Sequence, residues 1–148
     1  MDSTAYRIAF LLHILAIVVA FAAAIVNPRL AKLSKDAGGE TATLINRFIV
    51  NGSDRIHIPA LVATGFFGIL LIVLSDDLWA FDQTWVSLAF VLWFAMLAVL
   101  WFLVRPVEKR LAESSWNADD EKKLAMFGGI LHLLFLLMLI DMIWKPGL

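Results

Sequence analysis

The chain has 148 residues, of which 61% are hydrophobic and 17% charged, with a formal net charge of -1. A soluble domain averages roughly 45–50% apolar and about 25% charged residues. The excess of apolar side chains is more than one small core can bury, so a lipid bilayer is the expected surrounding. The balanced charge, without a basic patch, argues against nucleic-acid binding. The lack of cysteine excludes disulfides, thiolate metal sites, iron–sulfur clusters and cysteine nucleophiles.

Four apolar segments follow one another along the chain, at about residues 8–26, 58–75, 85–104 and 124–143. Each is close to the roughly 20 residues that a helix needs to cross a bilayer. A segment in lipid must satisfy its own backbone hydrogen bonds, so each is expected to be helical. The sequence therefore predicts an all-α fold, a single integral membrane four-helix bundle over residues 1–148.

The segments between the apolar runs contain helix breakers and a turn. Helix ends are expected at Asn27-Pro28, Asp76-Asp77, Arg105-Pro106 and Lys145-Pro146, since proline lacks a backbone donor. Gly38-Gly39 predicts a turn. After that turn, apolar residues recur with helical spacing at Leu44, Ile45, Phe48 and Ile49, with Asn46 and Arg47 on the opposite side. A short helix lying in the membrane interface is therefore expected in this first long loop.

Basic residues are unevenly distributed among the loops. The loops after the first and third apolar segments carry Arg29, Lys32, Lys35, Arg47, Arg55, Arg105, Lys109, Arg110, Lys122 and Lys123. The loop after the second segment carries three aspartates and no basic residue. Because loops rich in lysine and arginine stay in the cytoplasm, both termini are expected outside, in an N-out/C-out arrangement. A cleaved signal peptide, with Ala22 and Ala24 as its small-x-small site, is the alternative for the first segment.

Two histidines interrupt the apolar segments at an expected similar depth, His13 in the first and His132 in the fourth. Ionisable side chains inside a bilayer are costly, so each is a candidate functional residue. Small residues lie nearby on the same helices, namely Ala16, Ala20, Ala24, Gly128 and Gly129. Two imidazoles beside such surfaces could bind haem b as axial ligands between the helices. The alternative is that each imidazole hydrogen-bonds a neighbouring helix or handles protons.

Other polar residues are expected at the membrane boundaries. His57 falls where the second segment begins, and is expected to be interfacial rather than a ligand. Asp141 and Lys145 are spaced i, i+4, which predicts a local ion pair at the outer boundary. Arg7 is expected at the same depth. The three would form an outer-boundary polar cluster or a polar opening to an intramembrane site.

Two further functions remain open beside haem binding. Met138 and Met142 are one turn apart, and thioethers with imidazole suit Cu(I). The first of these functions is therefore that of a copper-handling membrane protein. A haem-free accessory or assembly subunit of a larger membrane complex, or a homo-oligomer, is the other. No phosphate-binding glycine loop, zincin helix or serine-elbow motif occurs. The catalytic residues are therefore unknown, and an enzyme of this kind would be a membrane oxidoreductase.

Three short motifs carry a family resemblance: Leu11-Leu12-His13-Ile14-Leu15, Val104-Arg105-Pro106 and Met142-Ile143-Trp144-Lys145-Pro146. Together with the proline- and glycine-containing second segment, they resemble the DUF2269 group of predicted bacterial integral membrane proteins. That group is loosely similar to HemJ-type protoporphyrinogen oxidases and to CopD-like copper-resistance membrane domains. The resemblance implies a bacterial inner (plasma) membrane location. Through the HemJ family it also implies haem ligation by His13 and a terminal Lys145-Pro146 signature, whereas DUF2269 itself implies no activity.

Overall fold

The computed structural model describes residues 3–113 and 117–147, nearly all of them helical. In chain order the helices are α1 (Thr4–Ala37), α2 (Gly39–Gly52), the π-helix η1 (Ser53–His57), α3 (Ile58–Val73), α4 (Thr84–Ala98), the π-helix η2 (Val99–Val104), α5 (Arg105–Glu113) and α6 (Ala118–Trp144). α2, η1 and α3 run on as one long helix, as do α4, η2 and α5. The described part of the chain is therefore four long helices without a strand, and the predicted all-α class is confirmed.

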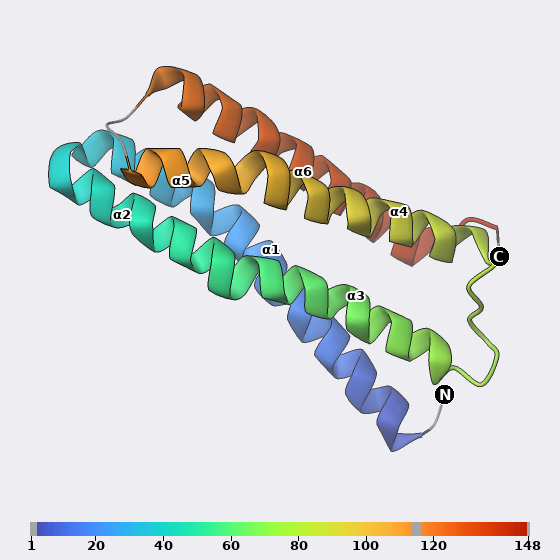
Figure 1. Ribbon diagram of the computed structural model, residues 1–148. Coiled ribbons are helices and arrows are strands. Elements are labelled where there is room, and N and C mark those ends of the chain that lie inside the picture. Colours follow the sequence, from blue (N-terminus) through green and yellow to red (C-terminus); the bar gives the residue numbers. More distant parts are fainter. Residues whose placement is uncertain (1–2, 114–116, 148) are drawn as a thin grey trace.

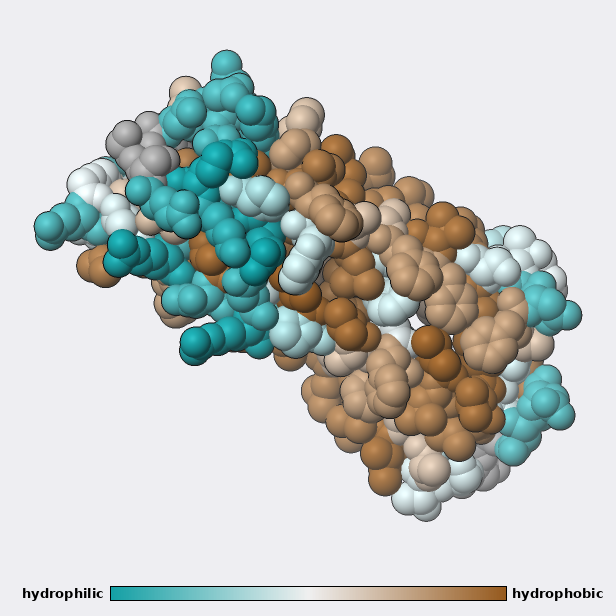
Figure 2. All heavy atoms as spheres, viewed as in Figure 1, coloured by the Kyte–Doolittle hydropathy of each residue, from teal (hydrophilic) through white to brown (hydrophobic). Residues whose placement is uncertain are grey.

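The two ends of the bundle differ. Both chain termini and the loop between α3 and α4 lie at one end, here called the terminal end (Figure 1). The turn between α1 and α2, the end of α5 and the start of α6 lie at the other, here called the basic end (Figure 1). Hydrophilic residues gather at the ends, above all the basic end, and the surface between them is hydrophobic (Figure 2). The two lysine- and arginine-rich loops thus share one end, as the topology predicted.

The apolar residues mostly face outwards. In the most apolar 18-residue stretch of each long helix, no more than 28% of the residues are buried. One cluster of buried apolar residues packs between the helices and comprises Ala20, Leu61, Met96, Leu100, Val104 and Leu131. By length and composition all four helices can cross a membrane. An apolar surface of this extent is typical of contact with lipid.

Pro28 was expected to end the first helix but lies inside it, since α1 continues to Ala37. Proline removes one backbone donor and leaves nearby carbonyls short of a partner. The guanidinium of Arg29 donates to the carbonyl oxygen of Ile25 (3.1 Å), which supplies a donor within the same turn. The expected stop at Asn27-Pro28 is therefore wrong, because the helix continues past the proline, with a side-chain donor on one carbonyl of the preceding turn.

Each π-helix comes shortly before a proline, η1 before Pro59 and η2 before Pro106. In both, the backbone N–H of the following residue, Ile58 or Arg105, donates to the carbonyl five residues back. This wider turn shifts the hydrogen-bond register just where the proline cannot donate. The helix consequently passes Pro106 and continues as α5, so the expected end at Arg105-Pro106 is also wrong.

The short interfacial helix expected around residues 44–49 is not a separate element. α2 covers this segment and joins α3 through η1 as one long helix. Leu44 and Phe48 are exposed on this helix, whereas Asn46 is buried. The Asn46 amide donates to the carbonyl oxygen of Leu111 on α5 (2.8 Å), and this satisfied hydrogen bond allows a polar side chain to lie between helices.

The other expected turns and ends are confirmed. Gly38 and Gly39 form the turn between α1 and α2, with φ of 64° and 54°, a region that favours glycine. α3 ends at Val73, shortly before Asp76-Asp77, and α6 ends at Trp144, before Pro146.

Ion pairs join the helices at the basic end, beyond the apolar segments. Arg105 of α5 pairs with Asp54 of η1, and Arg110 of α5 pairs with Asp120 of α6. Hydrogen bonds from Arg105 hold the pKa of Asp54 below its ordinary value, and those from Arg110 do the same for the pKa of Asp120. Both carboxylates are therefore ionised at neutral pH, which keeps the two pairs intact there.

Candidate functional site

Two cavities lie between the helices, one towards each end of the bundle. The His13 cavity has a volume of about 430 Å³, lies towards the terminal end, and is lined by α1, α3, α4 and α6. The His132 cavity has a volume of about 440 Å³, lies towards the basic end, and is lined by α1, α2, α6 and the segment from η2 into α5, with His57 of η1. Both volumes fall within the roughly 300–1,000 Å³ typical of small-molecule sites.

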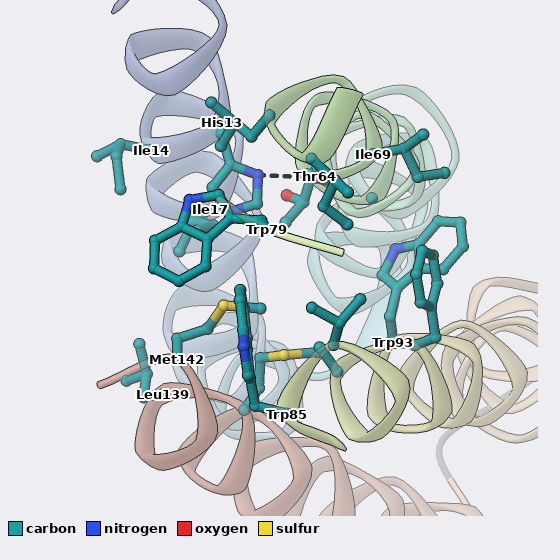
Figure 3. A pocket seen from close by; sticks show the side chains of 18 of the residues that line it. His13, Ile14, Ile17, Thr64, Ile69, Trp79, Trp85, Trp93, Leu139 and Met142 are labelled. Carbon is teal, nitrogen blue, oxygen red and sulfur yellow. Dashed lines mark hydrogen bonds between the residues drawn. The ribbon is translucent and has the colours of Figure 1, made fainter. Parts of the chain in front are cut away.

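His13 is held between α1 and α3. Its side chain is buried, and its Nδ1 donates to the backbone carbonyl oxygen of Thr64 (2.9 Å; Figure 3). A carbonyl oxygen can only accept, so Nδ1 carries the proton and Nε2 of the neutral imidazole keeps its lone pair. Gly68 lies against the ring, since a Cβ there would be 3.4 Å from Cε1 of His13. α3 thereby fixes the tautomer of His13 and leaves room beside its ring.

Aromatic side chains form much of the wall of the His13 cavity. In Figure 3, His13 and Thr64 lie on one side, Trp93 on another, and Trp85 and Met142 on the side facing His13. Trp93 is fixed by its indole N–H, which donates to the carbonyl oxygen of Leu61 (2.8 Å). The remaining aromatic lining comprises Tyr6, Phe10, Trp79, Phe90 and Phe135. Such a wall suits a flat, largely apolar ligand.

Three methionines line the same cavity as His13, namely Met96, Met138 and Met142. Met138 and Met142 are the pair that the sequence singled out. A thioether is a soft donor that can ligate haem iron or Cu(I). The His13 cavity therefore combines one imidazole with several thioethers in an apolar surrounding.

Lys145 lies at the terminal end of this cavity. Its ammonium is 3.9 Å from the centre of the Trp79 ring, and the Trp79 indole N–H donates to the Tyr6 hydroxyl (3.4 Å). Lys145 is past the last turn of α6, with φ of 43°, so its side chain is not aligned with the helix face that carries Asp141. The expected ion pair is accordingly not formed, and both carboxylate oxygens of the buried Asp141 lack a hydrogen-bond partner. Arg7, the third expected member of the polar cluster, is exposed near the start of α1.

The structure does not bring His13 and His132 to one cavity. His132 lines the cavity at the basic end, where its Nδ1 donates to the carbonyl oxygen of Gly128 on its own helix (2.7 Å). The histidine that shares this cavity is His57, which is buried in η1. Its expected position at the membrane interface stays a prediction. Haem ligation by His13 and His132 together thus has no common cavity to support it.

No protein-family model matches the chain, and neither the curated proteins nor the solved structures contain a match. The site must therefore be interpreted from its own geometry.

Glu108 is a cavity residue that the sequence did not reveal. It lies in α5 at the His132 cavity, with an exposed fraction of only 3%. Its Oε1 accepts from the Asn27 amide of α1 (3.5 Å), and Asn27 also donates to the Ser53 hydroxyl (3.2 Å). In the sequence Glu108 looked like one charge among many in a polar stretch. The available signal was its helical spacing from two apolar residues, Val104 and Leu111, which are also buried.

The chemistry of the two cavities differs. Among residues 3–113 and 117–147, no group of three histidine, cysteine or acidic side chains could hold a metal ion. The His13 cavity offers one imidazole and thioethers to a flat ligand or a soft metal. The His132 cavity offers a buried carboxyl and two imidazoles.

Proposed function

We propose that this chain is a four-span protein of a bacterial inner membrane, with the basic end in the cytoplasm and both termini outside. The support is the outward-facing apolar surface of four helices long enough to cross a bilayer, and the placement of the basic loops at one end. Assembly into a homo-oligomer or a larger membrane complex stays a prediction.

Single-cysteine variants test this topology, since the chain has no cysteine of its own. Asp82→Cys at the terminal end is expected to react with a membrane-impermeant maleimide in intact spheroplasts. Ala37→Cys at the basic end is expected to react only after the membrane is permeabilised. The reverse labelling pattern would invert the proposed topology, and labelling of both sites in sealed cells would contradict four spans.

We further propose that the His13 cavity binds haem b, which His13 would hold through its iron. The observation that carries the proposal is the buried His13 imidazole, fixed by the Thr64 carbonyl, beside a large cavity with aromatic walls. When a histidine ligates a metal through one ring nitrogen, a hydrogen bond from the other ring nitrogen orients the ring and raises the basicity of the ligating nitrogen. The bound haem would supply one-electron redox chemistry. This role agrees with what the resemblance implies for His13.

The other lining residues fit the same ligand. Met138 or Met142 of α6 could provide a thioether as a further ligand to the iron, since methionine and histidine together are known haem ligands. Lys145 could hold a carboxylate substituent of the ring at the terminal end, where its ammonium has only aromatic partners among the described contacts. Gly65 and Gly68 have no side chain, which lets the Trp93 indole and the His13 imidazole pack closely against α3. The chain would thus ligate the iron, cover the ring with apolar side chains and exclude water.

Copper(I) is the second candidate for this cavity, favoured by the presence of three methionines together with His13. Titration of the apoprotein with each candidate ligand distinguishes haem from copper. Apoprotein titrated with haemin develops a Soret absorbance if haem binds. Apoprotein titrated with Cu(I) against a coloured chelator withdraws the metal if copper binds, and this withdrawal should be lost in Met138→Leu and Met142→Leu.

A further inference from the structure

The His132 cavity contains buried polar atoms that no described residue satisfies. The Oε2 atom of Glu108 and the Nδ1 atom of His57 have no hydrogen-bond partner, and these side chains are 3% and 4% exposed. His132 uses Nδ1 as a donor to Gly128, so its Nε2 keeps a lone pair. Unsatisfied polar atoms at this degree of burial are rare, and a bound ligand is one reason for them.

The charged groups around Glu108 do not neutralise it. Arg105, on its own helix, is paired with Asp54 of η1. Lys32 of α1 is exposed, and Glu121 of α6 is paired with Lys35. Together with His57 and His132, these are the titratable groups that face Glu108 from the surrounding elements. A buried carboxylate in this position therefore lacks a buried cation among the described residues, which is unfavourable.

We propose that the His132 cavity binds a small protonated primary amine with an apolar body. The site is independent of whatever the His13 cavity holds. The ammonium would bind to the carboxylate of Glu108 and to the imidazole of His132, with His57 as a further acceptor. The apolar body would contact the rest of the lining, which includes Ala24, Ile49, Leu124, Ala125 and Leu131.

An ammonium group fits these atoms better than other ligands. It has three donors and no acceptor, and it carries the charge that Glu108 lacks. A neutral hydroxyl group brings no charge and leaves the carboxylate uncompensated. A metal ion is disfavoured because the described residues contain no group of three suitable ligands.

The pKa of Glu108, which lies beyond the apolar segment 85–104, gives the binding a pH dependence. Burial raises the pKa of this carboxyl to about 7, against the opposing effect of hydrogen bonds from Ser53 and Asn27. A cation binds the ionised form, whereas an alkylammonium stays charged well above neutral pH. Affinity should therefore fall as the pH decreases through 7 and Glu108 becomes protonated.

The first test uses the wild-type protein in detergent and isothermal titration calorimetry. n-Pentylamine is expected to bind at least about tenfold more tightly than 1-pentanol, the scale of a hydrogen bond to a charged group. Its affinity is expected to be higher at about pH 8 than at about pH 6. Equal affinity for the alcohol, a lack of saturable amine binding, or an amine affinity independent of pH would overturn the proposal.

The second test compares two variants of the same helix. Glu108→Gln keeps the size of the side chain but removes its charge, and is expected to weaken amine binding about tenfold and abolish its pH dependence. Glu113→Gln removes the same charge from an exposed position of α5 and is expected to bind like wild type. His132→Ala should weaken binding severalfold. Equal losses in both glutamine variants would show a general charge effect on the detergent surface and contradict a site at Glu108.

Discussion

Replacing His13 by alanine is expected to remove haem absorbance from the purified protein. In the proposed site, Nε2 of His13 is the imidazole ligand available in the aromatic cavity, since His132 lies in the other cavity. Haem iron held by thioether alone is not expected to survive purification. The measurement is the Soret absorbance per mole of protein, and the expected change is a loss of at least about tenfold, corresponding to one strong ligand bond.

Two further variants make this result specific. His13→Gln keeps an N–H donor for the Thr64 carbonyl but lacks the imidazole, and should lose haem like His13→Ala. His132→Ala should retain it, because His132 hydrogen-bonds Gly128 within α6 and does not line the His13 cavity. Helical circular dichroism confirms that each variant folds. Retention of haem in His13→Gln, or its loss in His132→Ala alone, would show that haem binds at a site other than His13.

Gly65→Ala is expected to destabilise the bundle more than any other single methyl addition at a glycine. A Cβ at Gly65 would lie 2.2 Å from Cε2 of Trp93, so α3 and α4 would have to move apart or the indole would have to leave its hydrogen bond to Leu61. Overpacking of this kind costs about 1–3 kcal/mol. The expected result is a clearly lower thermal unfolding temperature in detergent.

Gly129→Ala is the matched control, because nothing lies within 4 Å of a Cβ added there. Alanine is favoured over glycine inside a helix by about 1 kcal/mol, so this variant should be as stable as wild type or more so. If Gly65→Ala and Gly129→Ala unfolded at the same temperature, the close contact between Gly65 and Trp93 would be wrong. The pair thus tests the packing that forms one wall of the His13 cavity.

The existence of four helices could be predicted from sequence because it depends on long apolar segments, which need no tertiary information. The continuation of the helices past Pro28 and Pro106 could not be predicted. Proline is a strong local signal for a helix end, but whether it acts depends on the hydrogen bonds around it. At Pro28 a guanidinium supplies a donor, and before Pro106 a π-turn shifts the register. Both hydrogen-bonding arrangements depend on the three-dimensional structure around the proline, which the position of a proline in the sequence does not reveal.

The candidate site could be predicted only in part. His13 stood out because an imidazole within an apolar helix is unusual in any fold. The residues that share a cavity depend on how the helices are shifted along the bundle axis relative to one another. This shift depends on the length of α1 and on the long helix that runs through η1. That arrangement brought His57 to His132, and Glu108 to Asn27. The burial of Glu108 was missed because it stands in a charged stretch, although its helical spacing from Val104 and Leu111 was a signal for it.

The π-helices connect these observations. η1 contains His57, and η2 leads directly to Arg105 and Glu108. π-turns occur often at functional sites because they re-aim side chains without ending the helix. Here both lie beside the His132 cavity, next to Pro59 and Pro106. The departures from regular helix therefore coincide with the cavity that holds the unsatisfied polar atoms of Glu108 and His57.

The haem content of the wild-type protein tests the central claim most directly. The protein would be expressed in haem-replete cells, purified in detergent and assayed by its absorbance spectrum and by the pyridine haemochrome method. The proposal predicts a Soret band and about one haem b per chain, with the band shifting on reduction by dithionite. A folded, helical preparation that is colourless, and stays colourless after titration with haemin, would contradict haem binding in the His13 cavity.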